Sequence, residues 1–354
     1  MEVYIQGLGN ISPQHTIDNN AFLDDIVKQE GEMLQCVPPN YKDYIKPILL
    51  RRMSRLIKMG ISAAKICLQD ADVEAPGGII SGTGLGLVED TEKFLMSMLD
   101  NNEELLTPTA FIQSTHNTLS GQVAIALKCY DYNNTYSHRG FSFESALLDG
   151  AMLVDNKDAR NVLVSGFDEI TPQHYKIIKQ TEMIREEPTN HLELCEKAGK
   201  GTVAGEGVGF FLLDRERNEH SYAKLNDLET IYKPENKEFI TKKAQEFLAR
   251  NEMNFSDIDV VVTGMNGDSE GDAYYRQLLT DFTKATAVCF KHLCGEYHTS
   301  NTFGLWTAAK ILKHQTIPEA LLVKGAQKTK KAYQNILIYN HYRNTNHSFI
   351  LLSK

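Results

Sequence analysis

The chain has 354 residues, of which 42% are hydrophobic, and a formal net charge of −9. This apolar content can fill the core of one large domain or of two medium-sized halves. The negative charge argues against a general nucleic-acid surface, because phosphate contacts need clustered Lys and Arg. The sequence has no apolar run long enough to span a bilayer and no signal peptide, so we expect a cytoplasmic protein.

Short apolar runs that end at a glycine or another turn predict strands, and periodic apolar spacing predicts helices. The predicted strands are residues 3–5, 79–82, 161–165, 210–213, 225–232, 260–262, 321–323, 335–339 and 348–352. The predicted helices are residues 56–68, 89–99, 120–127, 239–248 and 303–312. Alternation of the two predicts an α/β sandwich.

The polar stretch 215–221 is the best internal boundary. The pattern of strands and helices restarts beyond it, although no direct sequence repeat is visible. We therefore predict a duplicated fold with two similar halves, residues 1–215 and 216–354.

Residues 133–154 contain a tight turn at Gly140, followed by a helix rich in small residues, among them Ala146 and Gly150. Enzymes place a nucleophile at such a turn, because the free N–H groups of the helix N-terminus point there. Here the turn residue has no side chain. The pattern indicates a catalytic architecture without its chemistry.

The six cysteines are spread along the chain and include no CxxC pair. This spacing is typical of free thiols in a reducing compartment, and it predicts neither a disulfide framework nor a zinc site. We expect no metal and no cofactor.

Motifs along nearly the whole chain occur in one order. They are VYIQGLGNISP, RRMSRLIKMGISAAKICLQDADV, SGTGLGLVEDTEKF, TPTAFIQSTHNTLSGQVAIALK, the Gly140 turn with VLVSGFDE, AGEGVGFFLLD, Gly271-Asp272, Lys291 with Gly295, and TNHS at residues 345–348. This set resembles the β-ketoacyl-ACP synthases, which are condensing enzymes of the thiolase fold. The resemblance implies a thiolase-like layered αβαβα sandwich built from two similar halves, whereas activity must be argued from the site itself.

The family's chemistry implies a cysteine thiolate that takes an acyl chain and two histidines that assist decarboxylation of a malonyl unit. The position of the cysteine is Gly140, and glycine cannot form a thioester. The first histidine falls at Gly264 or Asn266, and the shortened loop leaves both alignments open. The second falls at Glu296. We therefore expect no catalytic residue.

The family's lysine is retained as Lys291, but the carboxylate that usually partners it falls at Leu305. A buried lysine without a partner is costly, so we predict that Glu296 pairs with Lys291. The glycine-rich gating segment of the family is also missing, because residues 340–344 contain no glycine. That departure places the acyl gate and part of the oxyanion hole in question.

Other side chains have alternative interpretations. Ser137 and His138 precede the turn as a conceivable displaced nucleophile and base, although adjacent residues rarely face one another. Cys129 and Cys294 are conceivable surrogate thiols, although free cysteines are most often inert core residues. We expect His298 to be packed or solvated and not a metal ligand.

A condensing-enzyme fold with its nucleophile and both bases replaced resembles the chain-length factors of type II polyketide and polyene systems. The similarity is greatest to the small ketosynthase-like proteins of bacterial aryl-polyene and flexirubin-type pathways. It implies a subunit that is not active alone and that shapes the acyl tunnel of an active ketosynthase.

In such pairs the segment after the Ser/Thr-Pro motif crosses the dimer interface and bounds the tunnel. The corresponding residues here are Thr109, Ala110, Phe111 and Ile112, with Asn117 and Gln122 packing behind them. We predict that Phe111 closes the tunnel, since a large rigid apolar ring blocks an acyl chain effectively. The alternative is an ordinary core phenylalanine.

The resemblance implies a heterodimer with an active ketosynthase, or a homodimer. Acyl carrier protein is acidic, so a chain with a charge of −9 leaves most of its docking to a basic partner. The implied pathway is type II polyketide, aryl-polyene or fatty-acid-like biosynthesis. Two alternatives are a competent synthase or acyltransferase with a non-standard site, and an acyl-binding scaffold homodimer.

Overall fold

Ten strands form one hydrogen-bonded sheet in the computed structural model of the chain, which describes residues 1–104, 106–186, 190–326 and 332–354. The first half contributes β1 (Tyr4–Ile11), β3 (Gly78–Gly82), β4 (Tyr132–Tyr136), β5 (Asn161–Asp168) and β7 (Gly207–Asp214). The second half contributes β8 (Ala223–Tyr232), β9 (Val260–Thr263), β10 (Thr286–Cys289), β11 (Asn335–Tyr342) and β12 (Asn346–Ser353). Strands β2 (Met33–Leu34) and β6 (Ala204–Gly205) form a separate parallel pair.

Each half repeats the same strand arrangement. The sheet order is β10-β9-β11-β12-β8-β1-β7-β5-β3-β4, so each half places its first strand at the junction and its third strand at the outer edge. In both halves three strands are parallel, and the last strand runs antiparallel to its neighbours. The halves join where β1 pairs with β8 at Tyr4–Lys224 and Ile5–Ala223. The boundary between 215 and 216 lies in the connection from β7 to β8 and stays a prediction.

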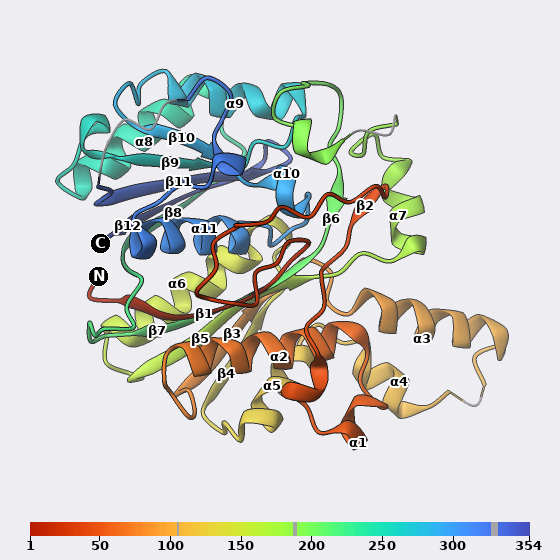
Figure 1. The fold of residues 1–354 in the computed structure, drawn as a ribbon. Coiled ribbons are helices and arrows are strands. Elements are labelled where there is room, and N and C mark those ends of the chain that lie inside the picture. The colour runs from red at the N-terminus through yellow and green to blue at the C-terminus, as the bar shows by residue number, and fades with distance from the viewer. Residues whose placement is uncertain (105, 187–189, 327–331) are drawn as a thin grey trace.

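Helices and sheets alternate in five layers, as Figure 1 shows. Helices α8 (Lys237–Arg250) and α9 (Ser269–Leu279) cover the sheet of the second half. Helices α6 (Ser142–Asp155) and α11 (Asn301–His314) lie between the two halves of the sheet, and α2 (Arg55–Asp70) and α5 (Thr118–Leu127) cover the outer face of the first half. The predicted αβαβα sandwich is confirmed. The remaining α-helices are α1 (Pro47–Leu50), α3 (Val88–Asp100), α4 (Pro108–Gln113), α7 (Pro172–Lys179) and α10 (Lys291–Cys294).

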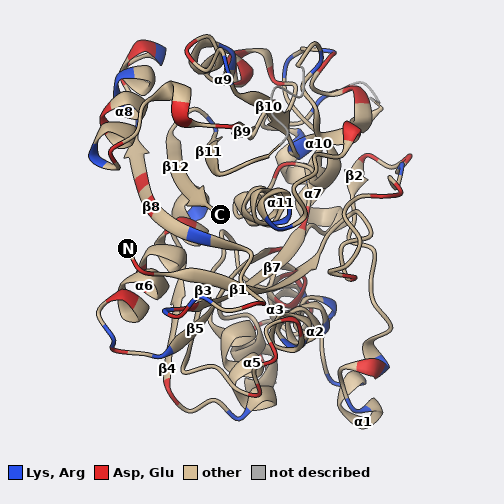
Figure 2. Ribbon diagram, turned by 60° about the vertical axis from the view of Figure 1, so that its left-hand side comes forward, with Lys and Arg blue, Asp and Glu red and all other residues tan. Residues whose placement is uncertain are grey.

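The apolar patterning explains the layers. Strand β5 is buried along its whole length, with Val162 and Val164 in the central core and Leu163 and Phe167 in the core beneath α2. A strand covered on both faces needs such a continuous apolar run. Helix α11 is buried from Asn301 to Leu312, as a helix between the two halves of the sheet must be. Charged residues gather on the outer helices and loops, and the strands of the first half are almost free of them (Figure 2).

One predicted strand is absent from the structure, and several observed elements were not predicted. Residues 321–323 do not form a strand; a 3-10 helix covers Glu319–Leu321, and only an isolated bridge joins Leu322 to Val288. Strands β4 and β10 were not predicted. Strand β4 has the sequence YNNTY, which lacks an apolar run because it lies at the sheet edge and pairs with β3.

Within the described ranges of the chain, no helix has both the length and the apolar composition needed to cross a membrane.

Candidate functional site

The turn at Gly140 lies between β4 and α6, in a 3-10 helix that spans Arg139–Phe141. Arg139 adopts a left-handed conformation with a φ of 49°, which makes the turn tight. Ser142, the first residue of α6, fixes this turn: its Oγ accepts a hydrogen bond from His138 N at 2.8 Å and lies 2.8 Å from Thr83 O. The predicted elbow is present, and Gly140 is buried.

Tyr342 occupies the space that a side chain at position 140 would need. A Cβ atom on Gly140 would lie 2.7 Å from Tyr342 Cβ and 3.1 Å from Asn346 Cβ. Both residues belong to the β11–β12 hairpin, which turns tightly because Arg343 and Asn344 have φ values of 54° and 53°. The segment at which the resemblance places a glycine-rich gate is thus a short hairpin in this chain, and it covers the elbow.

Lys291 and Glu296 form the ion pair that the charge balance predicted. Lys291 Nζ lies 2.9 Å from Glu296 Oε1 and 2.8 Å from Oε2, and it also donates to His341 O at 3.0 Å. The lysine side chain is completely buried and that of Glu296 is 8% exposed. The chain turns sharply at Gly295, between Lys291 and Glu296. This turn needs glycine, since its φ is 77° and a Cβ there would lie 2.5 Å from Gly205 Cα. The pair is thus a buried, geometrically favourable one.

Both open positions for the first histidine lie in this site. Asn266 donates from Nδ2 to Glu296 Oε2 at 2.6 Å. A Cβ at Gly264 would collide with Asn340 Oδ1 and would lie 3.1 Å from Lys291 Cε. Neither residue has a side chain that exchanges protons near neutral pH.

Asp272, at the start of α9, holds the loop that carries Asn266. Its carboxylate accepts from Asn266 N at 2.9 Å and from Gly267 N at 3.1 Å. Burial raises the pKa of Asp272 to about 6, although these backbone donors act in the opposite direction. A cavity of about 430 Å³ opens beside this loop, lined by Asn266 and Glu296 among other residues.

Two further residues, Tyr342 and His298, belong to the site; the sequence predicted that His298 is packed or solvated, and it is packed, but neither residue was predicted as part of the site. Their rings lie 4.6 Å apart between centroids, and burial lowers the pKa of His298. His298 packs against Gly84, where a Cβ would collide with its ring. Asp168 holds the segments around His298 and Gly84 together, since its carboxylate accepts hydrogen bonds from Gly84 N at 2.8 Å and from Thr299 N at 2.9 Å. For His298, the sequence signal was its place two residues after Glu296. For Tyr342, the signal was the absence of glycine from residues 340–344.

The alternative nucleophiles do not assemble. Ser137 and His138 are exposed, and their side chains share no hydrogen bond in the described part of the chain. Cys129 is buried and contacts Pro76 O at 3.4 Å. Burial raises the pKa of the Cys294 thiol, whose Sγ lies 3.4 Å from Gly295 O. These surroundings favour the inert core interpretation of both cysteines.

The predicted tunnel segment is α4. Phe111 and Ile112 are 57% and 60% exposed, and the Phe111 ring lies 5.6 Å from that of Phe94 on α3. The alternative of an ordinary core phenylalanine is therefore wrong for the isolated chain. Leu95, Met96 and Leu99 of α3 are also exposed, and we call these five exposed residues on α3 and α4 the α3–α4 face.

Thr109 is exposed and Ala110 half-buried on α4. Asn117 is exposed before α5, and Gln122 is half-buried on α5. Figure 1 shows α3 and α4 extending from the body of the molecule.

Comparison with known proteins agrees with this architecture. Residues 28–203 match the sequence model of the "Beta-ketoacyl synthase, N-terminal domain" family. The ishigamide ketosynthase/chain length factor structure has a TM-score of 0.78 at 14% identity, with 99% of this chain and 98% of that chain covered. The ketosynthase ApeO in complex with its chain length factor ApeC, from Xenorhabdus doucetiae, has a TM-score of 0.76 at 15% identity and coverages of 99% and 97%.

A β-ketoacyl synthase from Burkholderia phymatum STM815 has a TM-score of 0.77 at 14% identity, with 99% of each chain covered. No curated protein sequence matches the chain. The match to solved structures therefore defines the fold across the whole chain.

We predict that Glu296→Ala destabilises the protein strongly. Removing one member of a buried pair leaves the other charge unpaired, which typically costs about 3–5 kcal/mol. Urea unfolding would measure the change. The control is Glu193→Ala, which breaks the exposed ion pair with Lys197 and should have little effect. Equal unfolding midpoints for the two variants would contradict a buried pair.

We also predict that Gly140→Ala is destabilising by roughly 1–3 kcal/mol, because the added methyl group meets Tyr342. Gly121→Ala is the matched control: it lies in α5 with nothing within 4 Å of a Cβ and should be neutral or stabilising. In a Tyr342→Gly background, Gly140→Ala should lower the melting temperature by less than it does in the wild type, because the clashing side chain is gone. A Gly140→Ala protein as stable as Gly121→Ala would show that the hairpin does not fill the elbow.

Proposed function

Since this chain is ketosynthase-like in fold and matches the β-ketoacyl synthase N-terminal domain over residues 28–203, we propose that it is a non-catalytic chain-length-factor subunit. In this role it pairs with an active β-ketoacyl-ACP synthase and helps to shape the acyl tunnel of that partner. The observation that carries the proposal is that position 140 is a glycine with Tyr342 packed on it, so the turn offers neither a nucleophilic side chain nor the space for a thioester.

The remaining site supports the same role. Condensation needs a thiolate and proton-exchanging groups near the acyl carbonyl. The two histidine positions carry Glu296 and either Gly264 or Asn266, and Glu296 is engaged with Lys291 and Asn266. An acidic side chain that neutralises a buried lysine stabilises the fold, and it does not stabilise a developing oxyanion.

The surface offers two regions for a partner. The α3–α4 face exposes five large apolar residues on a part of the chain that extends from the body. Large exposed apolar patches mark protein interaction sites. The resemblance to chain-length factors gives this segment the role of crossing the dimer interface, with Phe111 at the tunnel end.

Strand β4 is the second region, because it forms an outer edge of the main sheet. Exposed Tyr132, Leu148 and Met152 surround this edge. Open strand edges readily pair with another strand, and the folds that this chain resembles dimerise through an extended sheet. A partner seated on β4 and on the α3–α4 face would cover the exposed apolar side chains.

The charge of −9 supports a division of labour in which the basic partner docks the acidic acyl carrier protein. Solved structures of similar fold include a ketosynthase with its chain length factor and an acyl-carrier protein in complex with its ketosynthase. We propose the same pathway class for this chain, type II polyketide, aryl-polyene or fatty-acid-like biosynthesis in the cytoplasm.

Co-expression tests the proposal. The partner would be a ketosynthase from a neighbouring gene that retains the cysteine and both histidines. We expect the two chains to purify together as a 1:1 complex and the isolated chain to make no condensation product. A chain that stays apart from every such ketosynthase, as a homodimer or monomer, would contradict the proposed function.

Phe111→Ala should lengthen the products of the reconstituted complex, because removing the ring opens space at the tunnel end. Product lengths would be compared by mass spectrometry. The control is Ile177→Ala on α7, an equally exposed apolar side chain (62%) on another part of the surface. An unchanged product distribution from an intact complex would remove Phe111 from this role.

A further inference from the structure

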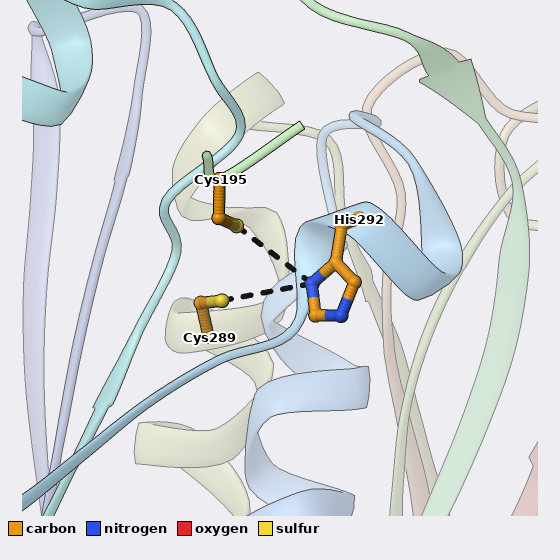
Figure 3. A group of neighbouring side chains, drawn as sticks. All are labelled: Cys195, Cys289 and His292. Carbon is orange, nitrogen blue, oxygen red and sulfur yellow. Dashed lines mark hydrogen bonds between the residues drawn. The ribbon is translucent and has the colours of Figure 1, made fainter. Parts of the chain in front are cut away.

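Cys195, Cys289 and His292 come together near the end of β10, although Cys195 is far from the other two along the sequence. Cys195 follows the 3-10 helix His191–Glu193, Cys289 ends β10, and His292 lies in α10. The Sγ atoms of Cys195 and Cys289 lie 3.8 Å and 3.6 Å from His292 Nδ1. All three potential ligand atoms lie within 4.8 Å of one another, and Figure 3 shows both sulfur atoms directed at the same ring nitrogen.

These separations match those between ligands of a tetrahedral zinc ion. Zinc bonds of about 2.3 Å to sulfur and about 2.0 Å to nitrogen, at tetrahedral angles, place sulfur and nitrogen about 3.6 Å apart. The two measured distances, 3.6 and 3.8 Å, agree with this value. The two sulfur–nitrogen separations therefore fit the ion, and the two sulfur atoms lie within 4.8 Å of each other.

The second nitrogen of His292 provides an independent observation. Its Nε2 lies 2.8 Å from Ala320 O, and a carbonyl oxygen can only accept a hydrogen bond. The proton of the neutral ring is thus on Nε2, and the lone pair of Nδ1 points toward the two sulfur atoms. Zinc-binding histidines are usually oriented by such a hydrogen bond from their other nitrogen.

From this geometry we propose that Cys195, Cys289 and His292 bind a Zn²⁺ ion. The two thiols lose their protons to solvent on binding, so two thiolates balance the charge of the ion. Cys195 is half-buried, whereas Cys289 and His292 are buried. Within the described residues the group contains three His, Cys, Asp or Glu ligands, so a water or a small-molecule donor would complete the tetrahedron.

The site joins a loop of the first half, at Cys195, to two elements of the second half. It ties the loop at Cys195 to β10 and α10, and α10 begins with Lys291, the lysine of the buried ion pair. Sequence spacing gave no sign of it, because only Cys289 and His292 are close in sequence and Cys195 is brought in by the fold. The proposal is independent of the chain-length-factor role.

The test measures metal content of the full chain. Protein purified with a reductant would be reconstituted with Zn²⁺, desalted and analysed by elemental mass spectrometry. We expect about one zinc per chain for the wild type and for Cys129→Ser, a control at a buried thiol that contacts Pro76. Cys195→Ser should lose most of the bound zinc, and its partly exposed position makes it the variant best able to fold.

Cobalt substitution gives a second readout. Co²⁺ in the wild type should show the thiolate charge-transfer and visible bands of a tetrahedral site, and both should weaken in Cys195→Ser. Reconstituted wild type without stoichiometric zinc would overturn the proposal, as would a Cys195→Ser variant that binds as much zinc. A Cys195–Cys289 disulfide in zinc-free protein that persists under reductant, detected by intact mass after alkylation, would also overturn it.

Discussion

The packing of the β11–β12 hairpin against the turn before α6 is the constraint on which the candidate site depends. Tyr342 lies where the first atom of a side chain at position 140 would be. The hairpin can approach so closely because position 140 is glycine, and any larger residue there would meet it. The absence of a side chain at the elbow and the closure over it thus depend on one contact.

The charges of the site follow the same logic. Lys291 is completely buried, and a buried ammonium group needs a partner. Glu296 supplies it from the second histidine position, while Leu305 is fully buried in the central apolar core. Glu296 therefore neutralises the buried lysine from the position at which the resemblance places a histidine. In the function that we propose, the partner subunit performs the chemistry.

The sequence predicted features that depend on local pattern or on charge balance. Continuous apolar runs such as 161–165 predicted buried strands, and the lone lysine predicted its pairing with Glu296. Features that depend on distant neighbours were missed. Strand β4 has no apolar run because it lies at an edge, Tyr342 reaches the elbow only through the hairpin, and Cys195 meets His292 only through the fold. Residue spacing in a single sequence does not predict such contacts between residues that are distant along the chain.

The central claim is that this chain holds no acyl group and acts on a reaction performed by its partner. The most direct measurement is intact mass spectrometry of the purified pair after incubation with acyl-loaded acyl carrier protein. The account predicts an acyl adduct on the ketosynthase subunit and an unchanged mass for this chain. An acyl adduct on this chain, in the pair or alone, would contradict it.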